Sequence, residues 1–229
     1  MMKQIFIACD TQNSNYVKKI IKDTNTKKIK IGYKLGLEFF TSKNGRLFIS
    51  KIKNKVIFLD LKLNDIPNTC ASTIYSLKDL KNIKYLTVHI NGGFEMLKSI
   101  KKAAKKTNKK LRILGVTVLT SLSNSSLKKI GHTKTIKSLV QQQAYLAKKA
   151  GLDGIVCSGL ESKLIKKICT KMEIVTPGIR LPGDKKNDQK RIMSPKQAFA
   201  NGATSIVIGR SVTSGNIKKN IQRLIKSLN

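Results

Sequence analysis

The sequence predicts an α/β protein in which residues 1–229 form a single domain, a (β/α)8 barrel. Eight short runs rich in isoleucine and valine alternate with lysine-rich amphipathic stretches, and this alternation is typical of a parallel sheet covered by helices. Eight such units in 229 residues fit the smaller barrels of this class. The competing doubly wound sheet usually has a GxGxxG turn after its first strand, whereas that position here reads CDTQNSN, without glycine.

Each element follows from its local pattern. The apolar, β-branched runs predict strands over residues 5–9, 30–34, 56–61, 85–89, 112–117, 154–157, 173–176 and 205–208. The amphipathic stretches between them predict helices over residues 14–22, 94–106, 134–150, 161–170 and 216–228. Pro67 suits the first turn of a further helix. No linker, low-complexity block or sequence repeat interrupts the series.

The predicted strands end in polar or charged residues. These are Asp10, Lys34, Asp60 with Lys62, His89, Thr117 with Thr120, Arg180 and Arg210. In a (β/α)8 barrel the carboxyl ends of all strands meet on one face, where the active site lies. The pattern therefore supports the barrel and indicates where its site is.

The stretch FLDLKLNDIPNT (58–69) places two of the chain's 12 acidic residues on either side of one lysine. Because side chains alternate between the two faces of a strand, Asp60 and Lys62 share a face with Phe58, whereas Leu59 faces the other way. In a barrel the first set points inward at the mouth, and the second packs under the helices.

Lys34, at the end of the second strand, extends this group to an alternating set of charges with Asp60, Lys62 and Asp65. Opposite unit charges about 4 Å apart are worth about 4 kcal/mol each at an effective dielectric near 20. Such a set is costly to desolvate and is weak evidence for stability. A structural ion pair is the alternative, but we favour a preorganised electric field, which makes these four residues the catalytic candidates.

Two further segments predict an anion site. VTPGIR (175–180) and IVIGRS (206–211) each place a glycine and an arginine just beyond the seventh and eighth strands. Glycine lets backbone N–H groups approach an anion, and arginine supplies charge and a fork of donors. Loops after these two strands form the usual phosphate site of the barrel, although either Gly-Arg pair alone could be an ordinary turn.

The chain is strongly basic, with 46 Lys and Arg against 12 Asp and Glu and a net charge of +34. This charge admits a polyanionic partner such as nucleic acid. However, lysine outnumbers arginine 40 to 6 and is spread along the chain, and arginine is the better reader of phosphates and bases. We therefore expect a solvated lysine surface, no nucleic-acid partner, and a positive field that steers a small anionic substrate.

The cysteines predict neither disulfides nor a metal site. Cys9, Cys70, Cys157 and Cys169 form no CxxC pair, and no histidine lies near them at metal-ligand spacing, as in buried free thiols of a reducing compartment. The apolar run at the N-terminus is too short for a signal sequence, and no run approaches the ~18 apolar residues of a membrane span. We expect a cytoplasmic protein with no membrane partner.

Taken together, these motifs resemble the orotidine 5′-phosphate decarboxylase family over nearly the whole chain. The matching segments are IACD (7–10), GYKLGLEFF (32–40), FLDLKLNDIPNT (58–69), VHINGG (88–93), GVTVLTS (115–121), VTPGIR (175–180), GDKKNDQKR (183–191) and IVIGRSVT (206–213). The DxKxxDIPNT element is the most specific. The resemblance implies a (β/α)8 barrel that converts orotidine 5′-monophosphate to UMP and CO2 in pyrimidine biosynthesis.

The resemblance also implies a role for each matching position. Lys62 is the implied proton donor, Asp60 lies near the substrate carboxylate, and Lys34 and Asp10 contact the ribose. The other implied substrate-binding positions are Thr120 beside the pyrimidine, Pro177 in the same site, Arg180, Gln189, Gly209 and Arg210 at the 5′-phosphate, and Asp65, Ile66 and Thr69, which reach into the neighbouring subunit's site. A homodimer with shared sites is thus implied.

The chemistry implied by the resemblance needs no cofactor. Loss of CO2 leaves a carbanion at C6 of the pyrimidine, for which other decarboxylases use pyridoxal phosphate or thiamine; we expect neither cofactor here. Placed charge can stabilise charge that develops in the transition state. Flanked by two carboxylates, Lys62 is expected to stay protonated and to deliver the proton, while Asp60 disfavours the ground state and the phosphate supplies binding energy.

Two alternatives remain open at this point. Phosphorylated-sugar decarboxylases and aldolases of the same superfamily also carry DxKxxD but bind Mg²⁺ there; the IPNT and VLTS segments favour the nucleotide enzyme. A basic nucleic-acid-binding protein, a different class, predicts tight, salt-sensitive binding and no turnover.

Overall fold

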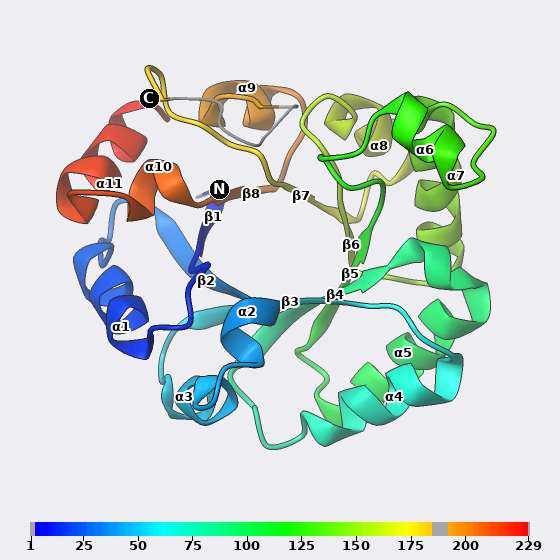
Figure 1. The fold of residues 1–229 in the computed structure, drawn as a ribbon, viewed down its shortest axis with the longest axis horizontal. Helices are drawn as coiled ribbons and strands as arrows, with labels where there is room; N and C mark the ends of the chain where they lie inside the picture. Colours follow the sequence, from blue (N-terminus) through cyan, green and yellow to red (C-terminus); the bar gives the residue numbers. More distant parts are fainter. Residues whose placement is uncertain (1–2, 185–191, 229) are drawn as a thin grey trace.

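Eight parallel strands close into a barrel in which each strand pairs with the next along the chain and the last pairs with the first. The computed structural model describes residues 3–184 and 192–228. The strands form a central ring, and the helices surround it (Figure 1). The predicted (β/α)8 barrel is therefore confirmed.

The strands lie close to their predicted positions. They are β1 (Gln4–Ala8), β2 (Lys30–Gly36), β3 (Val56–Leu63), β4 (Ile83–His89), β5 (Arg112–Val116), β6 (Gly154–Val156), β7 (Glu173–Thr176) and β8 (Ser205–Ile208). The largest differences are two residues long: β2 and β3 run two residues past their expected ends, and β4 begins two residues before its expected start. The sheet therefore also holds Lys62, which was expected just beyond the third strand.

The helices cover the outside of the ring. They are α1 (Ser14–Asp23), α2 (Leu37–Phe40), α3 (Gly45–Lys51), α4 (Pro67–Ser76), the 3-10 turn η1 (Ile90–Gly92), α5 (Gly93–Thr107), α6 (Asn124–Lys129), α7 (Ile136–Lys149), α8 (Ser162–Ile168), α9 (Pro195–Ala200), α10 (Arg210–Thr213) and α11 (Ile217–Lys226). The five predicted helices are α1, α5, α7, α8 and α11, and α4 begins at Pro67 as expected. The remaining helices are too short to show a periodic apolar pattern.

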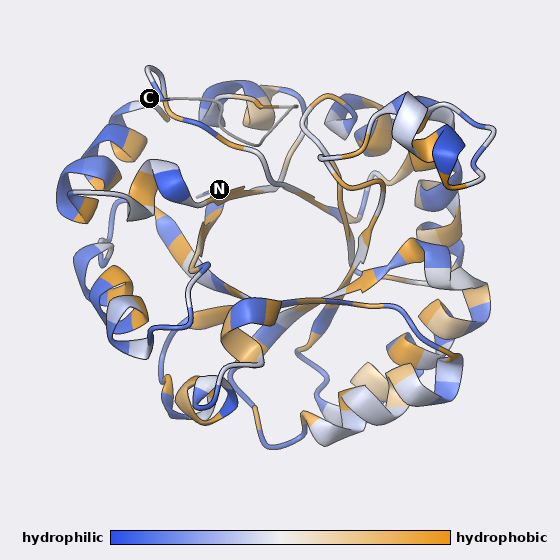
Figure 2. Ribbon diagram, viewed as in Figure 1, coloured by the Kyte–Doolittle hydropathy of each residue, from blue (hydrophilic) through white to orange (hydrophobic). Residues whose placement is uncertain are grey.

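The apolar residues form two separate layers. The larger one lies between strands and helices and includes Leu59 and Leu61; hydropathy colouring places apolar residues on the strands and on the sides of helices that face them (Figure 2). The smaller layer fills the barrel and includes Phe6, Phe58 and Tyr85. The Phe6 and Phe58 rings meet edge to face, with their centroids 5.0 Å apart. The predicted inward direction of Phe58 is thus confirmed, and the charged residues beyond it stand above an apolar plug.

Two other predictions can be compared with the structure. The four cysteines are free and buried, as expected from their spacing. In the described part of the chain, no helix has the length and apolar character needed to cross a membrane.

Candidate active site

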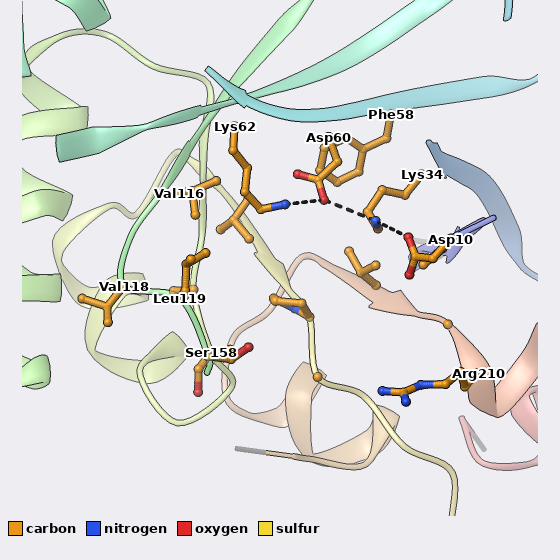
Figure 3. A pocket seen from close by; sticks show the side chains of 18 of the residues that line it. Asp10, Lys34, Phe58, Asp60, Lys62, Val116, Val118, Leu119, Ser158 and Arg210 are labelled. Atoms are coloured by element: carbon orange, nitrogen blue, oxygen red, sulfur yellow. Dashed lines mark hydrogen bonds and ion pairs between the residues drawn. The ribbon is translucent and has the colours of Figure 1, made fainter. Parts of the chain in front are cut away.

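Four charged side chains, on or just beyond three adjacent strands, meet at the carboxyl end of the barrel; we call Asp10, Lys34, Asp60 and Lys62 the charge network (Figure 3). Lys34 Nζ lies 3.0 Å from Asp10 Oδ1 and 3.3 Å from Asp60 Oδ2. Lys62 Nζ lies 2.9 Å from the same Asp60 oxygen. Asp60 is therefore the centre of the network, with two ammonium groups on one carboxylate oxygen.

Burial and charge oppose each other in the charge network. Burial acts to raise the pKa of Asp60, but Lys34 and Lys62 outweigh it and hold that pKa below its usual value of 3.8. Burial likewise acts to lower the pKa of Lys34, and the carboxylates of Asp60 and Asp10 raise it above 10.5. Asp60 and Lys34 are consequently charged at neutral pH although their side chains are only 11% and 12% exposed.

The backbone is irregular where the network is built. Leu59 pairs with Leu86 and Leu63 pairs with Val88, so three residues of β3 lie opposite a single residue of β4. Within this bulge Lys62 has a φ of +50°, a left-handed conformation that costs a residue with a β-carbon about 1–2 kcal/mol. Bulges re-aim side chains next to active sites, and this one occurs at the implied proton donor.

Asp65 does not pair with Lys62 within its own chain, so the four expected charges form a chain of contacts that ends at Lys62. Among the described residues the Asp65 carboxylate accepts a hydrogen bond only from the N–H of Ile66, at 2.6 Å, and the residue is exposed. The physical reason is the bulge at Lys62, after which the chain turns into α4. Asp65 therefore lies just before the helix N-terminus, where a negative charge is favourable.

Two arginines line the same cavity as the charge network. The cavity measures about 250 Å³, and both Arg180 and Arg210 line it together with the charge network. Gly178, between Pro177 and Arg180 in sequence, has a φ of +77°, which explains why glycine stands in that turn. One cavity is thus lined both by the charge network and by two arginines.

The structure brings most of the sequence-predicted residues together. Nine of them line the cavity: Asp10, Lys34, Asp60, Lys62, Thr120, Pro177, Arg180, Gly209 and Arg210. Asp65, Ile66 and Thr69 lie outside it, exposed at the start of α4, and Gln189 lies outside the described residues. His89, another polar strand end, is half-buried, and burial and then the charge of Lys62 lower its pKa. The roles assigned to all these residues remain predictions.

Sequence reasoning missed Thr87, which lies on β4 and is fully buried. Its hydroxyl donates to Asp60 Oδ1 at 2.8 Å and accepts the backbone N–H of Lys62 at 2.9 Å. A signal was present, because strand alternation puts Thr87 on the same inward face as Tyr85 and His89. A threonine in a strand is so common, however, that its type alone gave no reason to single it out.

The donor set at Asp60 bears on the metal-dependent alternative. In the described part of the chain, no three His, Cys, Asp or Glu side chains are grouped so as to hold a metal ion. Two ammonium groups contact one oxygen of Asp60, and the hydroxyl of Thr87 donates to the other. A divalent cation bound here would therefore be repelled by the two lysines. A metal-free reaction stays a prediction, which a chelator can test.

The fold and the site define a class: a (β/α)8-barrel enzyme whose cavity is lined by a charge network and two arginines. The family follows from comparison with known proteins. Residues 3–223 match the model of the Orotidine 5′-phosphate decarboxylase / HUMPS family, and the chain belongs to that family.

Individual relatives agree over the whole length of the chain. It is 47% identical to orotidine 5′-phosphate decarboxylase of Wolbachia sp. subsp. Brugia malayi, an alignment that covers 99% of this chain and 100% of that protein. It is 39% identical to the enzyme of the same name from Fusobacterium nucleatum, over 100% of this chain and 96% of that one. The crystal structure of orotidine 5′-phosphate decarboxylase from Lactobacillus acidophilus superposes with a TM-score of 0.85 at 32% identity, over 99% of both chains.

Proposed function

We propose that this chain is an orotidine 5′-phosphate decarboxylase, which converts orotidine 5′-monophosphate to UMP and CO2 in pyrimidine biosynthesis without a cofactor. Family membership and the names of relatives aligned over their whole length support the activity. The single observation that carries the proposal is the cavity, since the charge network and two arginines line the same space. A small anionic substrate with a reacting carboxylate and a phosphate fits this distribution of charge.

In the proposed reaction the bond between C6 and the carboxyl carbon breaks, its electron pair stays on C6, and CO2 leaves. Lys62 then transfers a proton from Nζ to C6 and regains one from solvent. Asp60 holds Lys62 Nζ at 2.9 Å, and it places negative charge where the substrate carboxylate must lose its own. The developing carbanion is stabilised by an ammonium group that is already in position, so little reorganisation is needed.

The proposed phosphate end provides binding energy rather than chemistry. Arg180 is buried, and its backbone N–H is tied to Met193 O at 3.0 Å, which fixes the turn that carries it. A guanidinium held in this way suits a phosphate dianion. Binding at this end holds the pyrimidine against the charge network, so that remote contacts lower the barrier at C6.

We also propose a homodimer in which Asp65, Ile66 and Thr69 serve the partner's site. Their position supports this, because the three residues lie exposed at the start of α4, outside the cavity of their own chain, and Ile66 is 66% exposed, so all three are accessible to a partner. Subunit mixing tests the proposal: Lys62→Ala and Asp65→Ala are each expected to be nearly inactive, but a mixed dimer carries one intact site. Randomly exchanged subunits should therefore regain about a quarter of wild-type activity; mixed dimers without any regain would contradict shared sites.

The location and the charge fit the same proposal. Four free, buried cysteines suit the reducing cytoplasm, where we place the protein. The net charge of +34 then acts as a field that attracts an anionic nucleotide. Weak binding to nucleic acid that disappears at moderate salt is compatible with this account.

Turnover of orotidine 5′-monophosphate tests the activity. We expect the absorbance of the orotate ring to fall, with one UMP and one CO2 formed per substrate consumed. EDTA is expected to leave the rate unchanged, whereas the Mg²⁺-dependent alternative predicts its loss. Folded, dimeric protein that leaves the absorbance constant would exclude the proposed activity.

A further inference from the structure

The bulge in β3 leaves the charge network without ordinary strand pairing on the side of β4. Asp60, Leu61 and Lys62 all pass Thr87, the single β4 residue between Leu86 and Val88. A single β4 residue cannot form regular ladder hydrogen bonds with three residues of β3. The backbone N–H of Lys62 is instead satisfied by the side chain of Thr87, at 2.9 Å.

The direction of these hydrogen bonds is fixed by chemistry. A backbone N–H can only donate, so Thr87 Oγ1 accepts from Lys62 and its own proton remains available for Asp60 Oδ1, 2.8 Å away. The acceptor is the Asp60 carboxylate, and a hydrogen bond to its ionised form is stronger than one between neutral groups. One hydroxyl therefore joins the backbone of the implied proton donor to the carboxylate that holds its ammonium group.

We propose that Thr87 is a positioning residue for decarboxylation, which fixes Asp60 and Lys62 relative to each other across the bulge. Its contact with Oδ1 leaves Oδ2 for the two ammonium groups, at 2.9 Å from Lys62 and 3.3 Å from Lys34. Its contact with the Lys62 N–H holds the left-handed backbone at φ +50°. A β-branched residue suits this task because its χ1 rotamer is restricted and the side chain is fully buried.

The inference rests on the proposed decarboxylation, and its experiment separates the two. Wild type, Thr87→Val and Thr87→Ser are compared in the orotidine 5′-monophosphate assay, together with UMP affinity. Valine keeps the shape but removes both hydrogen bonds; serine keeps the hydroxyl without the methyl group. We expect kcat of the valine variant to fall about tenfold to a hundredfold, the range for a buried hydrogen bond to a charged group. KM and UMP affinity should stay within about twofold, because the phosphate end is untouched.

Thr24→Val provides a matched control. Thr24 is also fully buried, and its hydroxyl makes two hydrogen bonds, to Ile20 O at 2.7 Å and to Tyr33 OH at 3.0 Å. It lies at the other end of the barrel, beside Lys30 and Val56. This variant should lose stability like Thr87→Val but retain the wild-type kcat per folded protein, which separates positioning from general destabilisation.

Each outcome decides the proposal. A low kcat in Thr87→Val, with its recovery to within several-fold of wild type in Thr87→Ser, supports it. Equal kcat values for wild type and valine variant, or the same loss in Thr24→Val, overturn it, whereas an inactive wild type rejects the proposed function instead. If Thr87→Val does not fold, Thr87→Ala takes its place beside Thr87→Ser, and equal kcat values for these two variants overturn the proposal.

Discussion

Two shielded carboxylates lie at opposite ends of the barrel, and their pKa values move in opposite directions. Asp60 at the mouth contacts two ammonium groups, and its pKa is lowered despite burial. Glu173, the first residue of β7, is also only 19% exposed and pairs with Arg112 at 2.9 Å, but there burial outweighs the arginine and raises the pKa. The carboxyl end of the barrel therefore favours the ionised form of its buried carboxylate, whereas the amino end favours the protonated form.

The difference lies in how many charges surround each group. Glu173 directly contacts one cation, Arg112, and the hydroxyl of Tyr85, at 3.4 Å; the charge of Asp153 also acts to raise its pKa, and within the described structure its Oε2 has no hydrogen-bond partner. Tyr85 belongs to the apolar layer inside the barrel, and burial raises the pKa of its hydroxyl to about 12. Asp60 has two cations and a donating hydroxyl. The contacts at the mouth keep Asp60 ionised despite the cost of desolvation. At the other end of the barrel the single ion pair of Glu173 does not offset that cost.

Lys62→Ala should show the largest effect, since it removes the proposed proton donor from the mouth. We expect turnover to fall by roughly ten-thousandfold or more, at the upper end for loss of a general acid that also stabilises charge. UMP binding should be largely retained because the arginine end is intact. Rates are followed by orotate absorbance and binding by calorimetry; near-normal turnover would rule out the role given to Lys62.

Lys34→Met should show the next largest effect. Removing this cation takes away one of the two charges that hold the pKa of Asp60 low, so that pKa rises and the acidic limb of the rate profile moves to higher pH. We expect kcat/KM to fall at least about tenfold at neutral pH because a preorganised cation beside the reacting group is lost, and to fall further at lower pH as Asp60 takes up a proton. A parallel profile, lowered equally at all pH values, would mean that Lys34 acts only by binding substrate.

Glu173→Gln should show a small effect, on stability alone. A carboxyl whose folded-state pKa is raised binds its proton more tightly when folded, so wild-type stability falls as pH rises from 4.5 through the raised value and is level above it. Glutamine cannot titrate, so the variant should lack this decline. Urea unfolding of both proteins from about pH 5 to pH 8 measures the difference; parallel stability curves would contradict the raised pKa.

Much of this arrangement was predictable from the sequence, for physical reasons. Alternation of strand side chains placed Phe58, Asp60 and Lys62 on one face, and the common direction of parallel strands brought Lys34 beside them. The bulge was not predictable, because it depends on how β3 registers against β4. The contacts of Thr87 follow from that bulge, so they were missed, whereas the outward direction of Asp65 agrees with the role across the dimer that the resemblance implied. The pairing of Tyr85 with Glu173 joins residues 88 positions apart, which no local pattern reports.

One measurement tests most directly the claim that charge at the mouth performs the chemistry: kcat of Asp60→Asn and Glu173→Gln, determined side by side on orotidine 5′-monophosphate. Both changes replace one carboxylate of the barrel by its uncharged amide. We predict that the asparagine variant loses at least about a hundredfold in kcat, as for loss of a preorganised electrostatic contact, while the glutamine variant stays within about twofold of wild type. Equal losses in the two variants, or an active Asp60→Asn enzyme, would contradict the account.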